Sequence, residues 1–294
     1  MTCGSLHQLG VVEKTALVIV CVFTLSSAFA PLIAPYDPYN LAAIDILDSL
    51  KPPAWMQGGD WRHVLGADDQ GRDLLSLIIY GTRSSFLIGM ISAMVAAAVG
   101  VVLGLTAAWL GGIADTIIMR IADVKMSFPA ILIALLVEGI SRVFVGPTHG
   151  TGVAVAILVL AISLSHWVQF ARTVRASALV EIRREYVKAA SILGLPAVTI
   201  VLRHILPNVT SPILVLGTLN LALAIVIEAT LSFLGAGLPA SQPSLGTLVR
   251  IGEGFLFSGE WWVALFPAVT LGVLIISINI LGDGLREVRD PRSR

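Results

Sequence analysis

The run from Asp68 to Asp73 is the densest group of possible metal ligands in the chain. A calcium loop alternates its acidic residues at fixed spacing and closes with a glutamate, and this run has neither feature. We interpret it as an Asp-capped turn, bent at Gly71, that leads into a helix ahead of the apolar segment 84–110. The two cysteines, Cys3 and Cys21, add no ligand cluster. The sequence therefore predicts no metal site.

Motifs for nucleotide hydrolysis and for hydrolytic catalysis are also missing from the sequence. A phosphate-binding loop needs a lysine directly after a glycine. The five histidines form no His-Glu-x-x-His pair, and no Gly-x-Ser-x-Gly turn occurs. We expect no catalytic residue and no cofactor bound directly by this chain. None of the four lysines follows a glycine: Lys14, Lys51, Lys125 and Lys188.

Two acidic residues lie within or beside strongly apolar segments, where an ionisable group is costly and indicates function. Glu138 precedes Arg142 by four residues, which is the spacing of an ordinary helical ion pair. Glu228 has no such neighbour. It is a candidate intramembrane functional residue with two alternatives left open: a cavity or gate role, or a structural pairing that ends the helix expected over residues 205–227.

Composition identifies the surroundings of these residues. The 294-residue chain is 56% hydrophobic and only 13% charged, against about 25% charged in soluble domains. These values exclude a disordered chain, a nucleic-acid-binding protein and most soluble enzymes. The sequence therefore predicts an all-α integral membrane protein in contact with lipid.

Charge-free windows predict six transmembrane helices, because about 20 apolar residues cross the hydrocarbon layer. An Ala-x-Ala sequence at Ala28 to Ala30 resembles a signal-peptide cleavage site, but Pro31 follows and the apolar run is long. We interpret the first window as an uncleaved anchor. The third window is the least regular, because Glu138 interrupts it. The windows are residues 15–34, 84–110, 126–145, 152–170, 205–227 and 261–282.

Six spans place both termini on one side of the membrane. If that side is the cytoplasm, the inner segments hold 13 of the 19 Lys and Arg residues, as the positive-inside rule requires. We therefore expect a multi-pass protein with both termini cytoplasmic. The predicted organisation has an N-terminal part with the first span and an outer segment, a five-helix core with an inner loop, and a C-terminal tail: residues 1–83, 84–285 (loop 171–204) and 286–294.

The inner loop 171–204 is much longer than a connection needs to be. Its composition predicts a helix over 172–193, ended by Gly194 in a left-handed conformation. Pro196 suits the first turn of a second short helix that reaches about Ile205, and Pro207 is expected to break the chain before the fifth span. The loop is an amphipathic helix-turn-helix, with Val187, Ala190, Leu193 and Leu195 as its apolar side.

The order of residues in this loop resembles a known family. Glu185 to Gly194, followed by Arg203 to Asn208, resembles the EAA loop of ABC importer permeases: Glu-Ala-Ala, three residues, Gly, and about ten more to an Ile/Leu-Pro ending. Further segments resemble the dipeptide, oligopeptide and nickel importer permeases, in the subunit type with an extra N-terminal span. They are residues 65–73 with Tyr80-Gly81-Thr82-Arg83, residues 120–124, residues 228–237, and residues 282–286 through Asp290-Pro291-Arg292.

The resemblance implies a six-helix type I ABC importer permease of the bacterial inner membrane that moves peptides, nickel or related small solutes. It implies as partners a homologous second permease, two cytoplasmic ATPases that use ATP and Mg, and a periplasmic binding protein, but no nucleic acid. Lys188 departs from the motif, which has Glu at that place, and Glu185 lies one turn away. The alternative is a stand-alone secondary transporter or channel. The residues that the resemblance assigns to ATPase coupling are Glu185, Tyr186, Lys188, Ala189, Ala190, Gly194, Leu195, Pro196, Arg203 and Pro207.

Overall fold

The computed structural model describes residues 10–40, 44–145, 150–239 and 242–289, and throughout these ranges the chain is helical apart from turns, loops and one isolated bridge, between Ala67 and Asp73. Five helices are long and apolar enough to cross a membrane. The all-α fold is confirmed. The five are α1 (Val11–Ala28), α3 (Leu74–Leu110), α6 (Thr151–Ile182), a continuous stretch Ala197–Phe233 that contains α8 (Ala197–Ile200) and α9 (Leu206–Phe233), and α11 (Trp262–Arg289).

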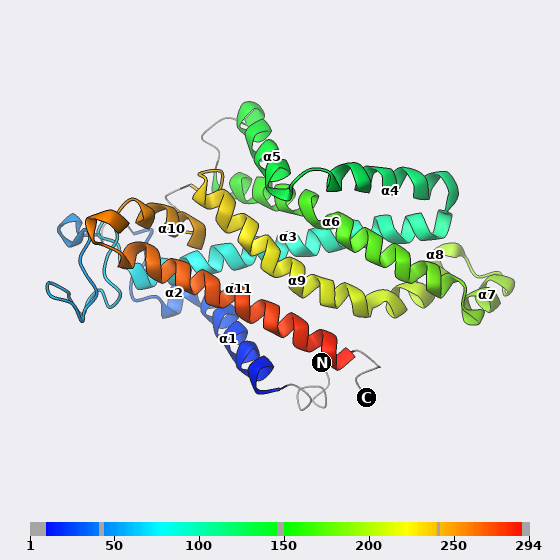
Figure 1. The fold of residues 1–294 in the computed structure, drawn as a ribbon, viewed down its shortest axis with the longest axis horizontal. Helices are drawn as coiled ribbons and strands as arrows, with labels where there is room; N and C mark the ends of the chain where they lie inside the picture. The colour runs from blue at the N-terminus through cyan, green and yellow to red at the C-terminus, as the bar shows by residue number, and fades with distance from the viewer. Residues whose placement is uncertain (1–9, 41–43, 146–149, 240–241, 290–294) are drawn as a thin grey trace.

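The third predicted span has a different form from the one expected. Helices α4 (Gly112–Met126) and α5 (Ala130–Val145) meet at a bend of 92°, so they count as a sixth span only if the pair is taken together. The bend falls at residues 127–129, where Pro129 cannot donate a helical hydrogen bond. Figure 1 shows α4 running back beside α3 and α5 turning away from it. Arg172 and Arg175 of α6 pair with Asp123 and Asp115 and hold α4 in place.

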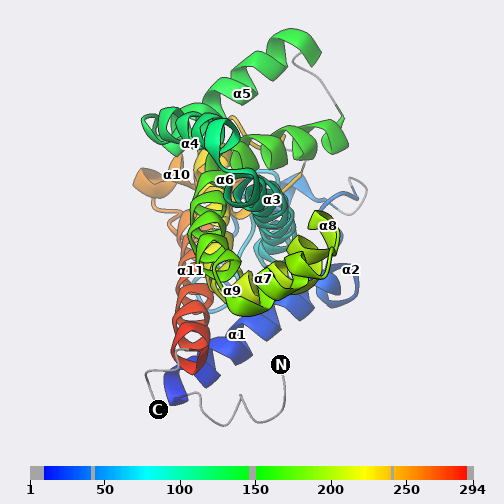
Figure 2. The same cartoon turned by 90° about the vertical axis from the view of Figure 1, so that its right-hand side faces the viewer.

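The second span, expected over 84–110, begins ten residues earlier and forms one helix with the segment that precedes it. This long helix α3 packs along α6, and the two run side by side through the molecule in both views (Figures 1 and 2). Their contact depends on glycine. A Cβ atom on Gly100 would lie 2.5 Å from the Trp167 carbonyl oxygen, and one on Gly104 would lie 2.5 Å from that of Ala171. The small-residue face therefore serves helix packing.

The fifth span also differs from the prediction. Pro207 does not break the chain, because helix runs on from Ala197 to Phe233 through a π-helical turn at Val201–Ile205. Proline in a helix removes one hydrogen bond and clashes with the preceding turn, and the wider π turn relieves that crowding. The Asn208 side chain donates a 2.7 Å hydrogen bond to the His204 carbonyl oxygen.

The acid-rich run 68–73 forms the expected turn. Asp68 accepts hydrogen bonds from the backbone nitrogens of Gln70 (3.0 Å) and Arg72 (2.8 Å), and Gly71 has a φ of 76°. Asp73 caps α3 by accepting from the Ser76 nitrogen at 2.8 Å. The turn thus leads directly into α3, with no separate helix before the span.

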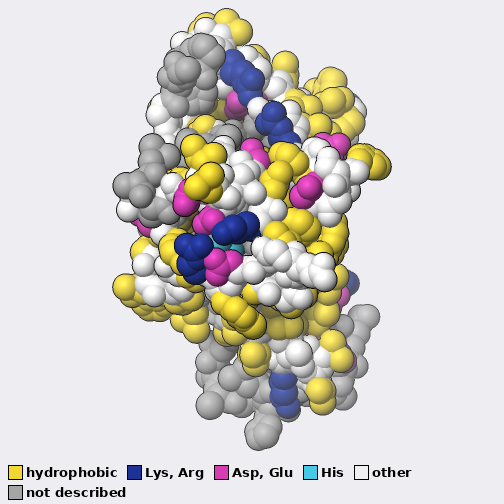
Figure 3. All heavy atoms as spheres, turned by 90° about the vertical axis from the view of Figure 1, so that its left-hand side faces the viewer, with side chains coloured by type: hydrophobic (Ala, Val, Ile, Leu, Met, Phe, Trp, Pro, Cys, Tyr) yellow, Lys and Arg dark blue, Asp and Glu magenta, His cyan; other side chains and the backbone are white. Residues whose placement is uncertain are grey.

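A network of ionisable side chains joins this turn to the preceding segment, residues 44–67. Buried His63 lies between two buried carboxylates, with Nε2 3.2 Å from Asp48 Oδ2 and Nδ1 3.3 Å from Asp73 Oδ1. Lys51 pairs with Asp48, and this bond lowers the pKa of that carboxyl. Figure 3 shows these charges gathered at one end of the molecule. No group of three or more His, Cys, Asp or Glu in the described ranges could hold a metal ion.

The remaining short helices lie at the two ends of the bundle. At one end are α2 (Ala30–Ile33), the turn Ile46–Asp48, α10 (Leu245–Glu253) and the turn Leu256–Ser258, and at the other end is α7 (Glu185–Ile192). Residues 290–294 of the predicted tail, including the Asp290-Pro291-Arg292 part of the resemblance, lie outside the described residues, as do residues 1–9.

Candidate functional site

The predicted coupling loop forms one end of the molecule. Helix α7 and the following α8 project beyond the bundle and face the viewer in Figure 2. The continuous helix expected over 172–193 is not present. Instead α6 ends at Ile182, and α7 starts after a break at Arg183 and Arg184. The loop is therefore a separate short helix, set at an angle to the span before it.

One face of the loop is fixed to the bundle. Val187 is 2% exposed and Ala190 is 5% exposed. Both belong to a buried cluster that joins the loop to the ends of α3, α6 and α9, so the loop is packed directly against these spans. The other buried members are Leu105, Ala108, Val174, Ala178, Ile200, Ile205 and Val209.

Tyr186 ties the two arms of the loop together. Its hydroxyl donates a 2.5 Å hydrogen bond to Glu181 Oε2 and accepts a 3.0 Å bond from Asn208 Nδ2. Burial and the bond to Glu181 raise the pKa of Tyr186, so the hydroxyl stays protonated. These bonds connect the end of α6 to the start of α9 across the base of the loop.

Gly194 stands at the tip, as the sequence predicts for a left-handed helix end. Its φ is 74°, and its nitrogen donates to the Ser191 carbonyl oxygen at 3.1 Å. The Leu195 nitrogen donates back to the Ala190 carbonyl oxygen at 3.2 Å, which closes the turn before Pro196 caps the next helix. A side chain here would meet nothing within 4 Å, so the backbone conformation alone selects glycine.

The outer face of the loop carries an exposed apolar ridge that the sequence analysis did not identify. Leu193 and Leu195, which the sequence placed on the apolar side of the loop, are both exposed, Leu193 by 79% and Leu195 by 38%. The signal in the sequence was the apolar pair at 192–193 directly before Gly194. We define the ridge as Ile192 (86% exposed), Leu193, Val198 (68%) and Leu202 (55%).

Charged side chains flank the ridge. Glu185, Lys188 and Arg203 are all exposed, and no ion pair of these three occurs in the part of the chain that is described. The remaining coupling candidates are also on the surface: Ala189, Pro196 and Pro207. The predicted coupling residues thus lie together at one end of the molecule. All of them are on its surface except Ala190, which is buried.

Glu228 lies far from this loop, in the other half of α9, and is fully buried. Its Oε1 accepts a 2.7 Å hydrogen bond from the Ser232 hydroxyl one turn on. Ser85 of α3 and Ser244, which caps α10, lie beside the same carboxyl. The Leu245 nitrogen donates to the Ser85 hydroxyl at 3.1 Å. Glu228 therefore sits where α3, α9 and α10 meet.

The Glu228 site gives a prediction that separates its two alternatives. Glu228→Gln keeps an oxygen that accepts from Ser232, so thermal unfolding of the purified chain is expected to stay near that of wild type. Glu228→Ala leaves buried hydroxyls without an acceptor, at a cost of about 1–3 kcal/mol. If the role of Glu228 is purely structural, transport by the Glu228→Gln variant should be unchanged. Lost transport with unchanged unfolding indicates a gate role instead.

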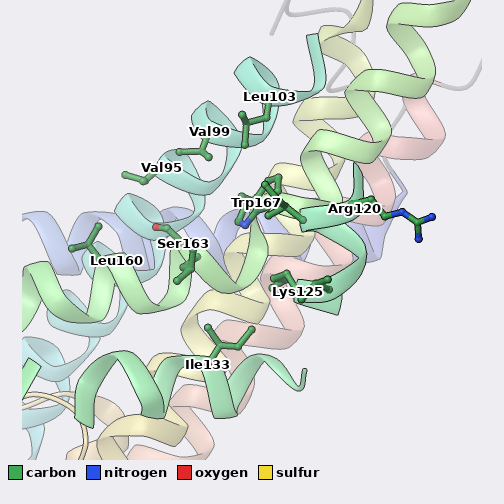
Figure 4. A pocket seen from close by; sticks show the side chains of 12 residues that line it. Val95, Val99, Leu103, Arg120, Lys125, Ile133, Leu160, Ser163 and Trp167 are labelled. Atoms are coloured by element: carbon green, nitrogen blue, oxygen red, sulfur yellow. The ribbon is translucent and has the colours of Figure 1, made fainter. Parts of the chain in front are cut away.

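An apolar hollow of about 700 Å³ opens between α3, α4, α5 and α6. Figure 4 shows Val99, Leu160 and Trp167 on its walls, with the Arg120 guanidinium pointing away from it. The Ser163 hydroxyl in its wall already donates to the Ser92 carbonyl oxygen at 3.1 Å. Lys125 also lines the hollow, and its amine donates to the Ser165 carbonyl oxygen. Both of these polar groups therefore already have partners within the chain.

Comparisons with known proteins agree with this architecture. The profile of the family described as binding-protein-dependent transport system inner membrane component matches residues 100–294. The profile described as the N-terminal TM domain of oligopeptide transport permease C matches residues 14–53.

Curated relatives extend the similarity to nearly the whole chain. The dipeptide transport system permease protein DppC of Haemophilus influenzae is 36% identical over 94% of this chain and 89% of its own length. The protein of the same name in Escherichia coli is 38% identical over 94% of this chain and 87% of its own length.

Solved structures show the same fold at lower identity. The inward-facing MetNI methionine ABC transporter matches 73% of this chain and 97% of its own, with a TM-score of 0.56 and 23% identity. An amino acid ABC transporter matches 70% of this chain and 91% of its own, with a TM-score of 0.53. Together with the family model and the curated relatives, this supports a permease of an ABC importer and not the alternative of a stand-alone secondary transporter or channel.

The fold, the helical loop at one end of the molecule, and the relatives that cover 94% of the chain all indicate the same family. The chain belongs to the family of binding-protein-dependent transport system inner membrane components and is a multi-pass permease subunit of an ABC importer.

Proposed function

We propose that this permease carries small peptides inward and is driven through the loop 171–204 by cytoplasmic ATPases. Two permease chains, two ATPases and an external binding protein make up the assembly. ATP and Mg are used in the ATPase chains, and this chain performs no catalysis of its own. Peptides are preferred over nickel and other solutes because the curated relatives cited above carry the names of peptide permeases.

The observation that supports this proposal most is the exposed apolar ridge Ile192, Leu193, Val198 and Leu202, backed by buried Val187 and Ala190. Exposed apolar side chains surrounded by charged residues are typical of a surface that binds a partner protein. A partner that grips the ridge pushes on the ends of α3, α6 and α9, and the rigid helices carry the motion across the membrane as alternating access.

The same loop supports the orientation. Arg183, Arg184, Lys188 and Arg203 lie on or beside it, and cytoplasmic segments carry such basic residues. Figure 1 shows the C-terminal end of α11 directed toward the same end of the molecule as α7. We infer that both termini and the loop face the cytoplasm.

Co-purification tests the function. The tagged chain, expressed with its neighbouring gene products, is expected to bring an ATPase out of the membrane in mild detergent. The double variant Ile192→Asp with Leu193→Asp is expected to lose the ATPase, because each apolar side chain contributes about 1.5–3 kcal/mol when buried at an interface.

Phe257→Asp is the matched control. Phe257 is 99% exposed at the opposite end of the molecule, so this variant should retain the ATPase. Recovery of the wild-type chain without any ATPase would contradict the proposed function. Recovery of the ATPase with the double variant would remove the ridge from it.

A further inference from the structure

A second, smaller hollow opens near the outer end of the bundle. It has a volume of about 290 Å³ and lies where α3, the start of α6, the segment after α2 and the segment after α9 meet. Small-molecule sites typically span about 300–1,000 Å³, so the hollow suits a solute of a few tens of atoms at most. Ile88, Val155 and Leu238 give it an apolar floor.

Arg83 lines this hollow and is partly buried. In the described ranges the structure records neither an ion pair nor a hydrogen bond for its guanidinium. A partly buried guanidinium without a partner is unfavourable, because the charge loses hydration and gains nothing in return. Its planar set of donors fits a carboxylate in two parallel hydrogen bonds.

Besides Ser84, three neutral polar side chains line the same hollow: Tyr39, Tyr80 and Gln242. Among the described residues, no hydrogen bond of either tyrosine hydroxyl or of the glutamine side chain is recorded. Tyr39 and Tyr80 pack edge to face, with ring centroids 5.3 Å apart, so these two lining side chains are in direct contact. The Ser84 hydroxyl, by contrast, donates to the Tyr80 carbonyl oxygen at 3.2 Å.

Asp37 lies two residues before Tyr39, and in the described ranges no ion pair between Asp37 and Arg83 is recorded. Asp37 is exposed, and its carboxylate accepts from the Tyr39 backbone nitrogen at 3.0 Å. An exposed charge is screened by water and salt, so it opposes an incoming anion only weakly. The hollow thus combines one available cation, three neutral hydrogen-bonding groups and an apolar floor.

We propose that this hollow binds the carboxylate of a small incoming solute, with Arg83 holding the carboxylate and the apolar floor taking an adjacent side chain. This inference rests on the proposed function, because it names the chemical class of the cargo: a short peptide or similar molecule with a free carboxylate. The site lies on the outer half of α3, where a solute passing inward meets the membrane-embedded part of the chain.

Direct binding to the full chain tests the site without the binding protein, whose own selectivity would mask it. The chain is placed in phosphatidylcholine nanodiscs, and binding of the dipeptide Ala-Phe and of Ala-Phe amide is followed by saturation-transfer NMR. Ala-Phe is expected to bind saturably. The amide lacks the carboxylate charge, and Arg83→Met lacks the guanidinium. Either change should weaken binding about tenfold or more, since hydrogen bonds between charged groups are stronger than those between neutral groups.

Two further variants control for folding and for surface charge. Arg83→Lys keeps a cation and should retain part of the binding, with the thermal unfolding of each variant measured in parallel. Arg62→Met removes an exposed arginine of the outer surface that pairs with Asp60 and does not line the hollow, so it should leave binding unchanged.

Three results would overturn the site: no saturable binding of Ala-Phe, equal binding of acid and amide, or unchanged binding in a folded Arg83→Met chain. Repeating the measurement with phosphatidylglycerol in the nanodiscs identifies a competing source of the anion. Fewer phosphatidylglycerol molecules retained by Arg83→Met, without any Ala-Phe binding, would assign Arg83 to a lipid phosphate and also overturn the proposal. Each of these failures leaves ATPase co-purification intact, so it is distinguishable from failure of the proposed function.

Discussion

Replacing Gly194 by valine is expected to uncouple ATP hydrolysis from transport while the chain still inserts and folds. The φ of 74° at this position lies in the left-handed region, which β-branched residues avoid. The strain is of the order of 1–3 kcal/mol, and it is relieved by reopening the turn between Ala190 and Leu195. The ridge that begins at Ile192 then loses its fixed angle to the spans.

Asparagine provides the matched control. It adopts left-handed conformations far more readily than valine, and there is open space around Gly194 for its side chain. Gly194→Asn should therefore retain coupled transport. The measurement is uptake and ATPase stimulation by the reconstituted complex, with membrane insertion checked by protease accessibility. Unchanged uptake and stimulation in Gly194→Val would remove the loop tip from the coupling mechanism.

The tip of this loop was predictable, but the way in which it joins the bundle was not. Gly194 followed by Pro196 is a local signal, and it gives the turn that the structure contains. The break at Arg183 and Arg184 has no glycine or proline to mark it. It arises because Val187 and Ala190 must reach the ends of α3, α6 and α9, which is a tertiary demand that overrides helix propensity.

Pro207 and Pro129 show that a residue can mark an irregularity in a helix without determining what form the irregularity takes. Both prolines are visible in the sequence, yet Pro207 is accommodated by a π turn and Pro129 falls at a bend of 92°. The outcome depends on the surroundings. Asn208 satisfies the His204 carbonyl oxygen, whereas α4 is held against α6 by the pairs Arg172–Asp123 and Arg175–Asp115. Residue type marks the place of an irregularity, but packing decides its form.

The candidate sites divide in a similar way. The motif order located the predicted coupling loop, and its pattern grouped Leu193 with Val187 and Ala190 on one apolar side. The structure buries Val187 and Ala190 but leaves Leu193 exposed. A helix of eight residues makes barely two turns, so a small rotation exchanges its faces. The hollow around Arg83 could not be predicted from the sequence, because Tyr39, Arg83 and Gln242 come from three separate segments that only the fold brings together.

Replacing Gly100 by leucine is expected to prevent stable accumulation of the chain. Even a single Cβ atom there would collide with the Phe170 Cβ and lie 2.5 Å from the Trp167 carbonyl oxygen and 2.9 Å from the Ala171 nitrogen. Two of these three atoms belong to the backbone of α6, so no rotamer change makes room for the leucine. Overpacking of a core typically costs about 1–3 kcal/mol, and a cost at or above that range is expected when two helices must separate.

Alanine variants test this packing argument most directly, because they add only the Cβ. Gly100→Ala should lower the thermal midpoint of the detergent-purified chain. Gly217→Ala, in α9, places the same atom where nothing lies within 4 Å, and should raise stability by up to about 1 kcal/mol through better helix propensity. Equal midpoints for the two alanine variants, or normal accumulation of Gly100→Leu, would mean that α3 and α6 do not depend on close approach at Gly100. Opposite shifts would show that the glycine is retained for space, since backbone flexibility changes in the same way at both positions.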